Sequence, residues 1–114
     1  MPCTDPRDVT SLQEAFDLTT TDIRQWELEL IWTAELLGVL AMSSHARRAA
    51  RDDSIPTEAV MRVVHDGAPR SKDVTPSGRR RIGINFEGKR RGGGRLRTKV
   101  GWSEEYVVIT VHAI

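Results

Sequence analysis

The pattern of hydrophobic and polar positions divides the chain into a helical first part and a β-rich last part. Apolar residues recur every three or four positions over residues 22–41 and 57–66, which predicts two helices. Serines that can act as N-caps precede a further predicted helix over 45–53. A short helix is predicted over residues 12–18. Residues 1–10 have no periodic apolar pattern, so we expect them to be loosely ordered.

The predicted helix over residues 22–41 is the most apolar element. It is expected to start near Asp22, because a run of threonines before it offers capping hydroxyls. Alternation between Trp26 and Trp32 also fits a strand, but the acids between them and the Ala-Glu-Leu-Leu continuation favour a helix. The two tryptophans fit either core packing or an interface with a partner or a second copy of the chain.

The last part of the chain predicts a sheet. Gly67 suits a left-handed helix end, and the proline- and serine-containing residues 68–78 predict a loop. Strands are predicted over 80–87, 95–102 and 106–113, and their short connections imply an antiparallel meander.

Helices followed by strands predict an α+β fold, with N-terminal helices packed on one face of a small antiparallel sheet. A chain of 114 residues that is 39% hydrophobic suffices for one compact core. We therefore expect residues 1–42 to form an N-terminal extension with a long apolar helix, and residues 43–114 to form the α+β domain.

Alternation along the strands predicts which side chains share a face. In the third strand, Val107, Ile109, Val111 and Ala113 would face the helices with the apolar rows of the other two strands. The opposite face would then hold cations, a histidine and two hydroxyls. Its predicted members are Arg81, Asn85, Arg97, Lys99, Tyr106, Thr110 and His112.

Charge is concentrated near this predicted face, although the whole chain carries only +1. Residues 1–60 hold 5 basic and 11 acidic side chains, whereas residues 61–114 hold 12 and 5. Residues 79–99 alone contain nine Lys and Arg against one acid, Glu87. Such a concentration marks where an anionic partner would bind.

Two interpretations of the cationic face remain open. An antiparallel sheet commonly keeps one solvated face, on which Arg and Lys are ordinary. A face of one sign, however, brings like charges opposite each other, and a phosphodiester would relieve the repulsion. RNA or DNA is the simplest such anion. The glycine-rich tip at 89–91 differs from the strand-borne cations, because a solvated loop explains it equally well.

The sequence predicts no metal site and no cofactor. His45, His65 and His112 lack the spacing of a metal motif, and the one cysteine, Cys3, is expected to be an incidental surface thiol. No apolar run is long enough to span a bilayer, and the N-terminus does not have the pattern of a secretory signal, so no membrane contact and a cytoplasmic location are predicted.

Several short motifs resemble a widespread family of small bacterial proteins. They are Ser44-His45-Ala46 at a helix start, the valines at 60, 63 and 64, Gly67-Ala68-Pro69, residues 80–84, and the closing run from Tyr106 to His112. This family of unknown function looks related to RelE-like and BrnT-like toxins, which have a microbial ribonuclease fold. The resemblance covers roughly residues 43–113.

The resemblance implies a toxin-like, metal-independent ribonuclease that binds RNA on the basic sheet face. His45 matches the family's helix-opening histidine, and Thr110 and His112 lie on its final strand. The candidate catalytic residues are His45, His112, Tyr106 and Thr110. The candidate nucleic-acid-binding residues are Arg48, Arg81, Arg95, Arg97 and Lys99.

Other functions fit the same pattern. The protein could bind nucleic acid or act as a regulator without cleaving anything. Its partners could include an acidic antitoxin protein on the basic face, or a second copy of the chain through the 22–41 helix.

Overall fold

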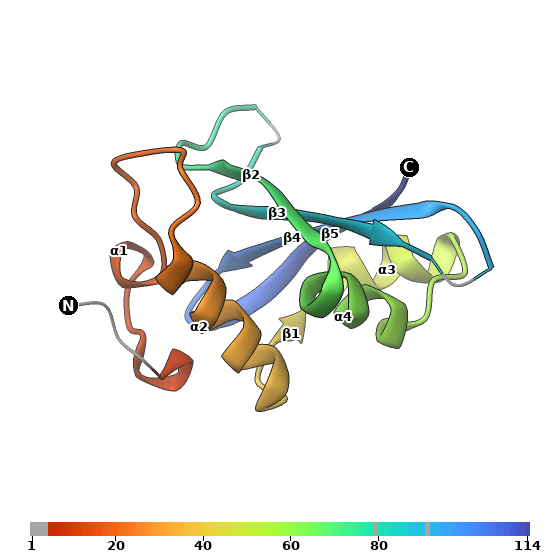
Figure 1. Ribbon diagram of the computed structural model, residues 1–114, viewed down its shortest axis with the longest axis horizontal. Helices are drawn as coiled ribbons and strands as arrows, with labels where there is room; N and C mark the ends of the chain where they lie inside the picture. Colours follow the sequence, from red (N-terminus) through yellow and green to blue (C-terminus); the bar gives the residue numbers. More distant parts are fainter. Residues whose placement is uncertain (1–4, 79, 91) are drawn as a thin grey trace.

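The computed structural model describes residues 5–78, 80–90 and 92–114 (Figure 1). Cys3, Arg79 and Arg91 lie outside the described residues, so the expectation for the Cys3 thiol is not addressed by the structure. In chain order the elements are η1 (Pro6–Asp8), α1 (Leu12–Ala15), α2 (Gln25–Leu36), β1 (Ala41–Met42), α3 (Ser44–Asp52), α4 (Thr57–Asp66), β2 (Ala68–Asp73), β3 (Gly83–Lys89), β4 (Arg95–Trp102) and β5 (Tyr106–Ala113).

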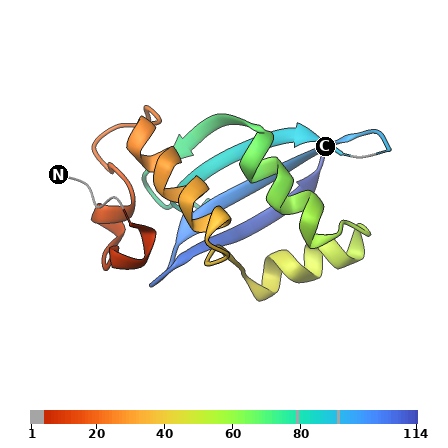
Figure 2. The same ribbon diagram turned by 60° about the horizontal axis from the view of Figure 1, so that its bottom comes forward.

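The α+β fold predicted from the sequence is confirmed. The sheet has five strands in the order β1-β5-β4-β3-β2, and its centre is the predicted antiparallel meander of β3, β4 and β5. The sheet is mixed because β1 runs parallel to β5. Helices α2, α3 and α4 lie over one face of the sheet (Figure 2), and in the described part of the chain no helix covers the opposite face (Figure 1). Within the described residues, no helix has the length and apolarity to cross a membrane.

The prediction of a loop over residues 68–78 is wrong for its first half, because residues 68–73 form strand β2. This strand pairs with β3 and lies at the edge of the sheet. An edge strand tolerates proline, because one row of its amides needs no partner, and Pro69 is accommodated next to a register shift at Arg70. Proline therefore marked an edge strand here and not a loop.

The predicted helix over 22–41 is shorter than its apolar pattern suggested. It starts at Gln25, where the carboxylate of Glu27 accepts a hydrogen bond of 2.6 Å from the amide of Arg24. It ends at Leu36, because Gly38 adopts a left-handed conformation with φ of 72° and the amide of Val39 returns to the carbonyl of Ala34.

The end of α4 also differs from the expectation. Gly67 is extended, with φ of −73°, and not left-handed. A glycine is needed there for close approach, since a Cβ would collide with the carbonyl oxygen of Val63 and lie 2.7 Å from that of Glu87. Because Gly67 has no side chain, β2 can begin directly after α4 and pair with β3.

A β-bulge in β5 overturns the predicted alternation of this strand. Lys99 pairs with Thr110 but Val100 pairs with Val108, which leaves Ile109 as the extra residue. The side chains before the bulge are therefore inverted relative to the prediction, and Tyr106 lies in the core with 1% exposure. Its hydroxyl donates a hydrogen bond to the carbonyl of Ala15, so the prediction that Tyr106 lies on the basic face is wrong.

Residues 5–42 and residues 43–114 share one hydrophobic core. The ring of Phe16 packs edge-on against Tyr106, with centroids 6.1 Å apart. The indole of Trp32 donates a 2.9 Å hydrogen bond to the carbonyl of Val64 in α4. Val9 is buried too, so the N-terminal segment is more ordered from residue 5 onward than its sequence predicted. Of the two roles proposed for the tryptophans, core packing is the one that these contacts support.

The most constrained contact between the two parts is a buried ion pair. The side chains of Lys72 and Glu27 are both fully buried, and the Lys72 Nζ atom lies 3.0 Å from Glu27 Oε1. Lys72 also donates to the carbonyl of Asp17, while Glu27 accepts from the amides of Asp17 and Arg24. Every charge is thus hydrogen-bonded several times, which a buried pair requires.

Removing one member of this pair is expected to destabilise the fold strongly. Glu27→Gln leaves the Lys72 ammonium buried without a counter-charge, and we expect a loss of about 3–5 kcal/mol in the free energy of unfolding. Urea denaturation measures this loss. The control is Glu29→Gln in the same helix, where the glutamate is exposed and the change should stay within about 0.5 kcal/mol. Equal effects of the two substitutions would contradict the role of the pair.

Candidate basic groove

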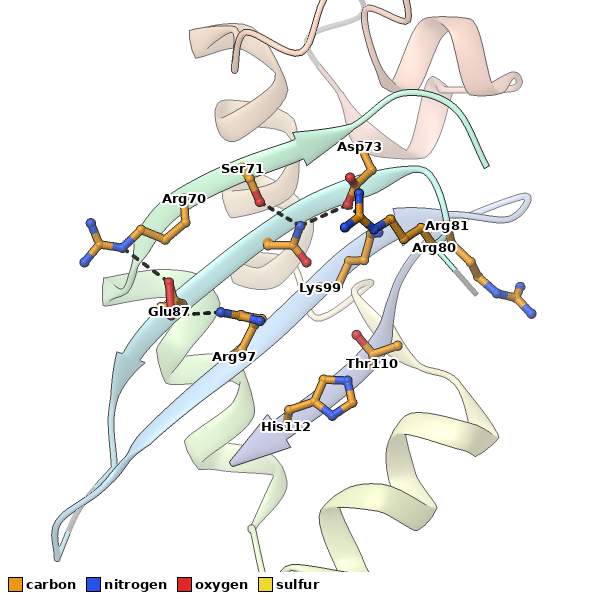
Figure 3. Close-up of a pocket in the computed structure, with 11 residues that line it drawn as sticks. Arg70, Ser71, Asp73, Arg80, Arg81, Glu87, Arg97, Lys99, Thr110 and His112 are labelled. Carbon is orange, nitrogen blue, oxygen red and sulfur yellow. Dashed lines mark hydrogen bonds and ion pairs between the residues drawn. The ribbon is translucent and has the colours of Figure 1, made fainter. Parts of the chain in front are cut away.

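The face of the sheet opposite the helices carries a groove of about 510 Å³ (Figure 3). It is built from strands β2 to β5 and from the residues that precede β3. We call it the basic groove, and it is lined by Arg70, Ser71, Asp73, Arg80, Arg81, Asn85, Glu87, Arg97, Lys99, Thr110 and His112.

Strand register places the central side chains in two rows across the groove. Arg97 of β4 lies between Glu87 of β3 and His112 of β5. Lys99 lies between Asn85 and Thr110 in the same way. Because His112 and Thr110 follow the bulge, they keep the orientation that the sequence predicted. The predicted grouping of Arg97, Lys99, Thr110 and His112 is thus found in the structure.

Lys99 is held inside a polar network at one end of the groove. Its Nζ atom lies 2.8 Å from Oδ2 of Asp73, and its side chain is only 7% exposed. The amide of Asn85 donates to the same oxygen of Asp73 and to the hydroxyl of Ser71. The Lys99 charge is therefore largely neutralised and fixed in place, which suits a positioning role better than free contact with phosphate.

The pKa of Asp73 reflects this network. Partial burial raises the pKa, but hydrogen bonds from Lys99 and Asn85, together with the positive charges of Lys99 and Arg80, outweigh it and lower the pKa below its ordinary value. A lowered pKa means that ionised Asp73 stabilises the fold above its unfolded pKa. This stabilisation is lost as the pH falls through the folded pKa.

Arg97 is held more loosely. Its guanidinium lies 3.5 Å from Glu87, and Arg70 approaches the other carboxylate oxygen of Glu87 at the same distance. The side chains of Arg97 and Arg70 are 48% and 53% exposed, so these ion pairs contribute little and can be replaced. A phosphate group can therefore compete for both guanidiniums, and each can bind it bidentately.

The expectation of a face with one sign of charge is wrong. Five Lys and Arg side chains line the groove, but Asp73 and Glu87 lie among them. Each acid sits next to at least one of the cations, which relieves the repulsion without any ligand. The groove still has an excess of positive charge, and this excess is the observation that favours an anionic partner.

Some predicted site residues lie elsewhere. His45 is exposed on α3 and does not line the groove. Arg48 lines a different hollow with Arg47 and Arg51 of the same helix. Arg95 is exposed at the far end of the hairpin, paired with Lys89, and is not part of the groove lining. Arg81 does line the groove, at its edge before β3.

Sequence reasoning missed three groove residues of β2, namely Arg70, Ser71 and Asp73, because that strand was taken for a loop. It also left Glu87 unassigned, although alternation from Asn85 would have placed Glu87 on the same face. Among the described residues, no group of three or more His, Cys, Asp or Glu side chains could hold a metal ion.

Comparisons with protein-family models, with curated proteins and with solved structures gave no match to this chain. The likeness to RelE-like and BrnT-like toxins therefore stays an expectation from short sequence motifs.

The Asp73–Lys99 contact can be tested by titration. We expect NMR of the side-chain carboxyl to give Asp73 a pKa below the ordinary value of about 3.9. Lys99→Met should raise this pKa, because it removes both a hydrogen bond and a positive charge. Lys89→Met at the exposed end of β3 is the matched control and should leave it unchanged. If Lys99→Met leaves the pKa of Asp73 unchanged, the contact between the two side chains does not form in solution.

Proposed function

We propose that this protein binds single-stranded RNA, with the phosphates of the RNA in the basic groove. The observation that carries the proposal is the excess of exposed arginines in a hollow on the helix-free sheet face. Arg70 and Arg97 are bound to Glu87 only through long contacts, so phosphate oxygens can replace the carboxylate. Phosphate contacts of this kind dominate affinity for nucleic acid.

We further propose that the bound RNA is cleaved without a metal. The RNA 2′-hydroxyl would attack the adjacent phosphorus, with its proton passing to His112. The bond from phosphorus to the 5′-oxygen would break, and that oxygen would take a proton from water. Arg97 lies directly across from His112 and would stabilise the negative charge that develops on the phosphate. Histidine suits the proton transfer because its pKa lies near neutrality.

Binding without cleavage is the second candidate. Two observations favour it: of the three histidines only His112 lines the groove, and Lys99 is already neutralised by Asp73. A mechanism with one histidine as base and another as acid therefore lacks its second group, since His45 lies on α3. The assay for cleavage separates the two candidates.

A toxin-like role would place the protein in the cytoplasm, where its RNA is found, and would require an antitoxin. An acidic antitoxin segment would compete with RNA for the basic groove. A homo-oligomer through α2 would have to use the end of the helix, because Leu28, Leu30 and Ile31 are buried within the chain. The exposed apolar residues there are Leu36, Leu37 and Val39.

His112→Ala is expected to lower the rate of RNA cleavage by about 10²- to 10⁴-fold, which is the usual contribution of a general acid or base. RNA binding should change little, because the arginines remain. The rate is measured on a short labelled RNA, and affinity by fluorescence anisotropy. His65→Ala on α4 is the matched control and should retain the full rate.

Two outcomes would contradict this assignment. If His112→Ala cleaves as fast as the unchanged protein while His45→Ala does not, the catalytic site lies on α3. If the protein binds RNA but leaves it intact, the binding function alone stands.

A further inference from the structure

A second hollow, of about 760 Å³, adjoins the basic groove. Arg80 and Arg81, which precede β3, line both hollows and lie at their boundary. The second one differs in chemistry, because half-buried apolar side chains contribute much of its lining. We call it the apolar hollow and define it by Ile82, Trp102, Val107 and Ile109.

The bulge in β5 builds this hollow. Ile109 is the extra residue, and its side chain lies against Gly101 of the neighbouring strand. A Cβ at Gly101 would collide with the Ile109 side chain and lie 2.8 Å from the carbonyl oxygen of Ile82. The absence of a side chain at Gly101 therefore lets Ile109 pack flat against β4. The result is an apolar surface at the end of a cationic groove.

An occupant that fills both hollows needs an apolar flat part joined to a negative part. A nucleotide has this combination, since its base has an apolar face and its phosphate carries the charge. The guanidinium groups at the boundary can bind phosphate on one side and stack on a base on the other. The volume of the apolar hollow falls within the usual range for small-molecule sites.

We propose that the apolar hollow binds one nucleobase of the RNA whose phosphates occupy the basic groove. This inference rests on the proposed binding of single-stranded RNA and adds the place of one base, which has to be unpaired because a base within a duplex cannot turn into the hollow. Arg80 and Arg81 lie between the two parts of the bound nucleotide.

The test compares two probes with equal numbers of phosphates. One is a short deoxycytidine oligomer, which lacks the 2′-hydroxyl and is not cleaved, and the other is the abasic oligomer of the same length. We expect the protein to bind the oligomer with bases about five-fold or more tightly, which is the usual gain from packing one base. Fluorescence anisotropy at fixed low salt measures both affinities.

Variants locate the effect. Ile82→Ser combined with Ile109→Ser should remove most of the preference for the oligomer with bases and leave affinity for the abasic oligomer unchanged. Val107→Thr keeps the shape of the side chain and provides a milder variant if the first folds poorly. Independently, the oligomer with bases should quench tryptophan fluorescence, and Trp102→Phe should abolish the quenching, because Trp26 and Trp32 belong to α2.

The outcomes separate this inference from the proposed function. Equal binding of the two oligomers by the unchanged protein would overturn the base site while leaving phosphate binding intact. A preference for bases that survives in both apolar-hollow variants, or quenching that survives in Trp102→Phe, would overturn its location. Failure of both oligomers to bind would overturn nucleic-acid binding itself.

Discussion

The ion pair between Lys72 and Glu27 is the constraint on which much of the structure depends. A buried charge without a partner is costly, so Lys72 has to face the core at a position where Glu27 can meet it. This requirement joins strand β2 to the start of α2 and to the backbone of Asp17. The N-terminal segment is thereby part of the domain, which its separate position in the sequence did not suggest.

The same ion pair determines which side chains of β2 lie on the helix-free face of the sheet. With Lys72 inside, the alternation of β2 turns Ser71 and Asp73 outward, and a slip of one residue would reverse both. Asp73 then meets Lys99 and Asn85, and this network closes one end of the basic groove. The bulge at Ile109 lies toward the same end of the strands, next to Thr110, and adds an apolar surface beside the groove.

Local signals in the sequence predicted the parts that local interactions determine. Ser43 caps α3 as expected, and the strands at 95–102 and 106–113 have the predicted bounds, because short turns and alternation specify a meander. Contacts between distant residues were not predictable in this way. Lys72 and Glu27 are 45 positions apart in the sequence. Strand β2 was taken for a loop because it contains Pro69, which only an edge strand tolerates. No local sequence signal marks Ile109 as a bulge. In the groove, the sequence therefore placed Arg97, Lys99, Thr110 and His112 together, but it misplaced Tyr106 and missed the residues of β2.

We propose that RNA binds to the helix-free face of the sheet, and not to α3 or to the hairpin tip. Backbone amide NMR during titration with a short single-stranded oligomer that lacks the 2′-hydroxyl tests it most directly. We expect the largest chemical-shift changes at Arg97, Thr110 and His112, with a second group at Ile82 and Val107. Changes confined to Arg48 and Arg51 of α3, or to Lys89 and Arg90 of the hairpin, would contradict it.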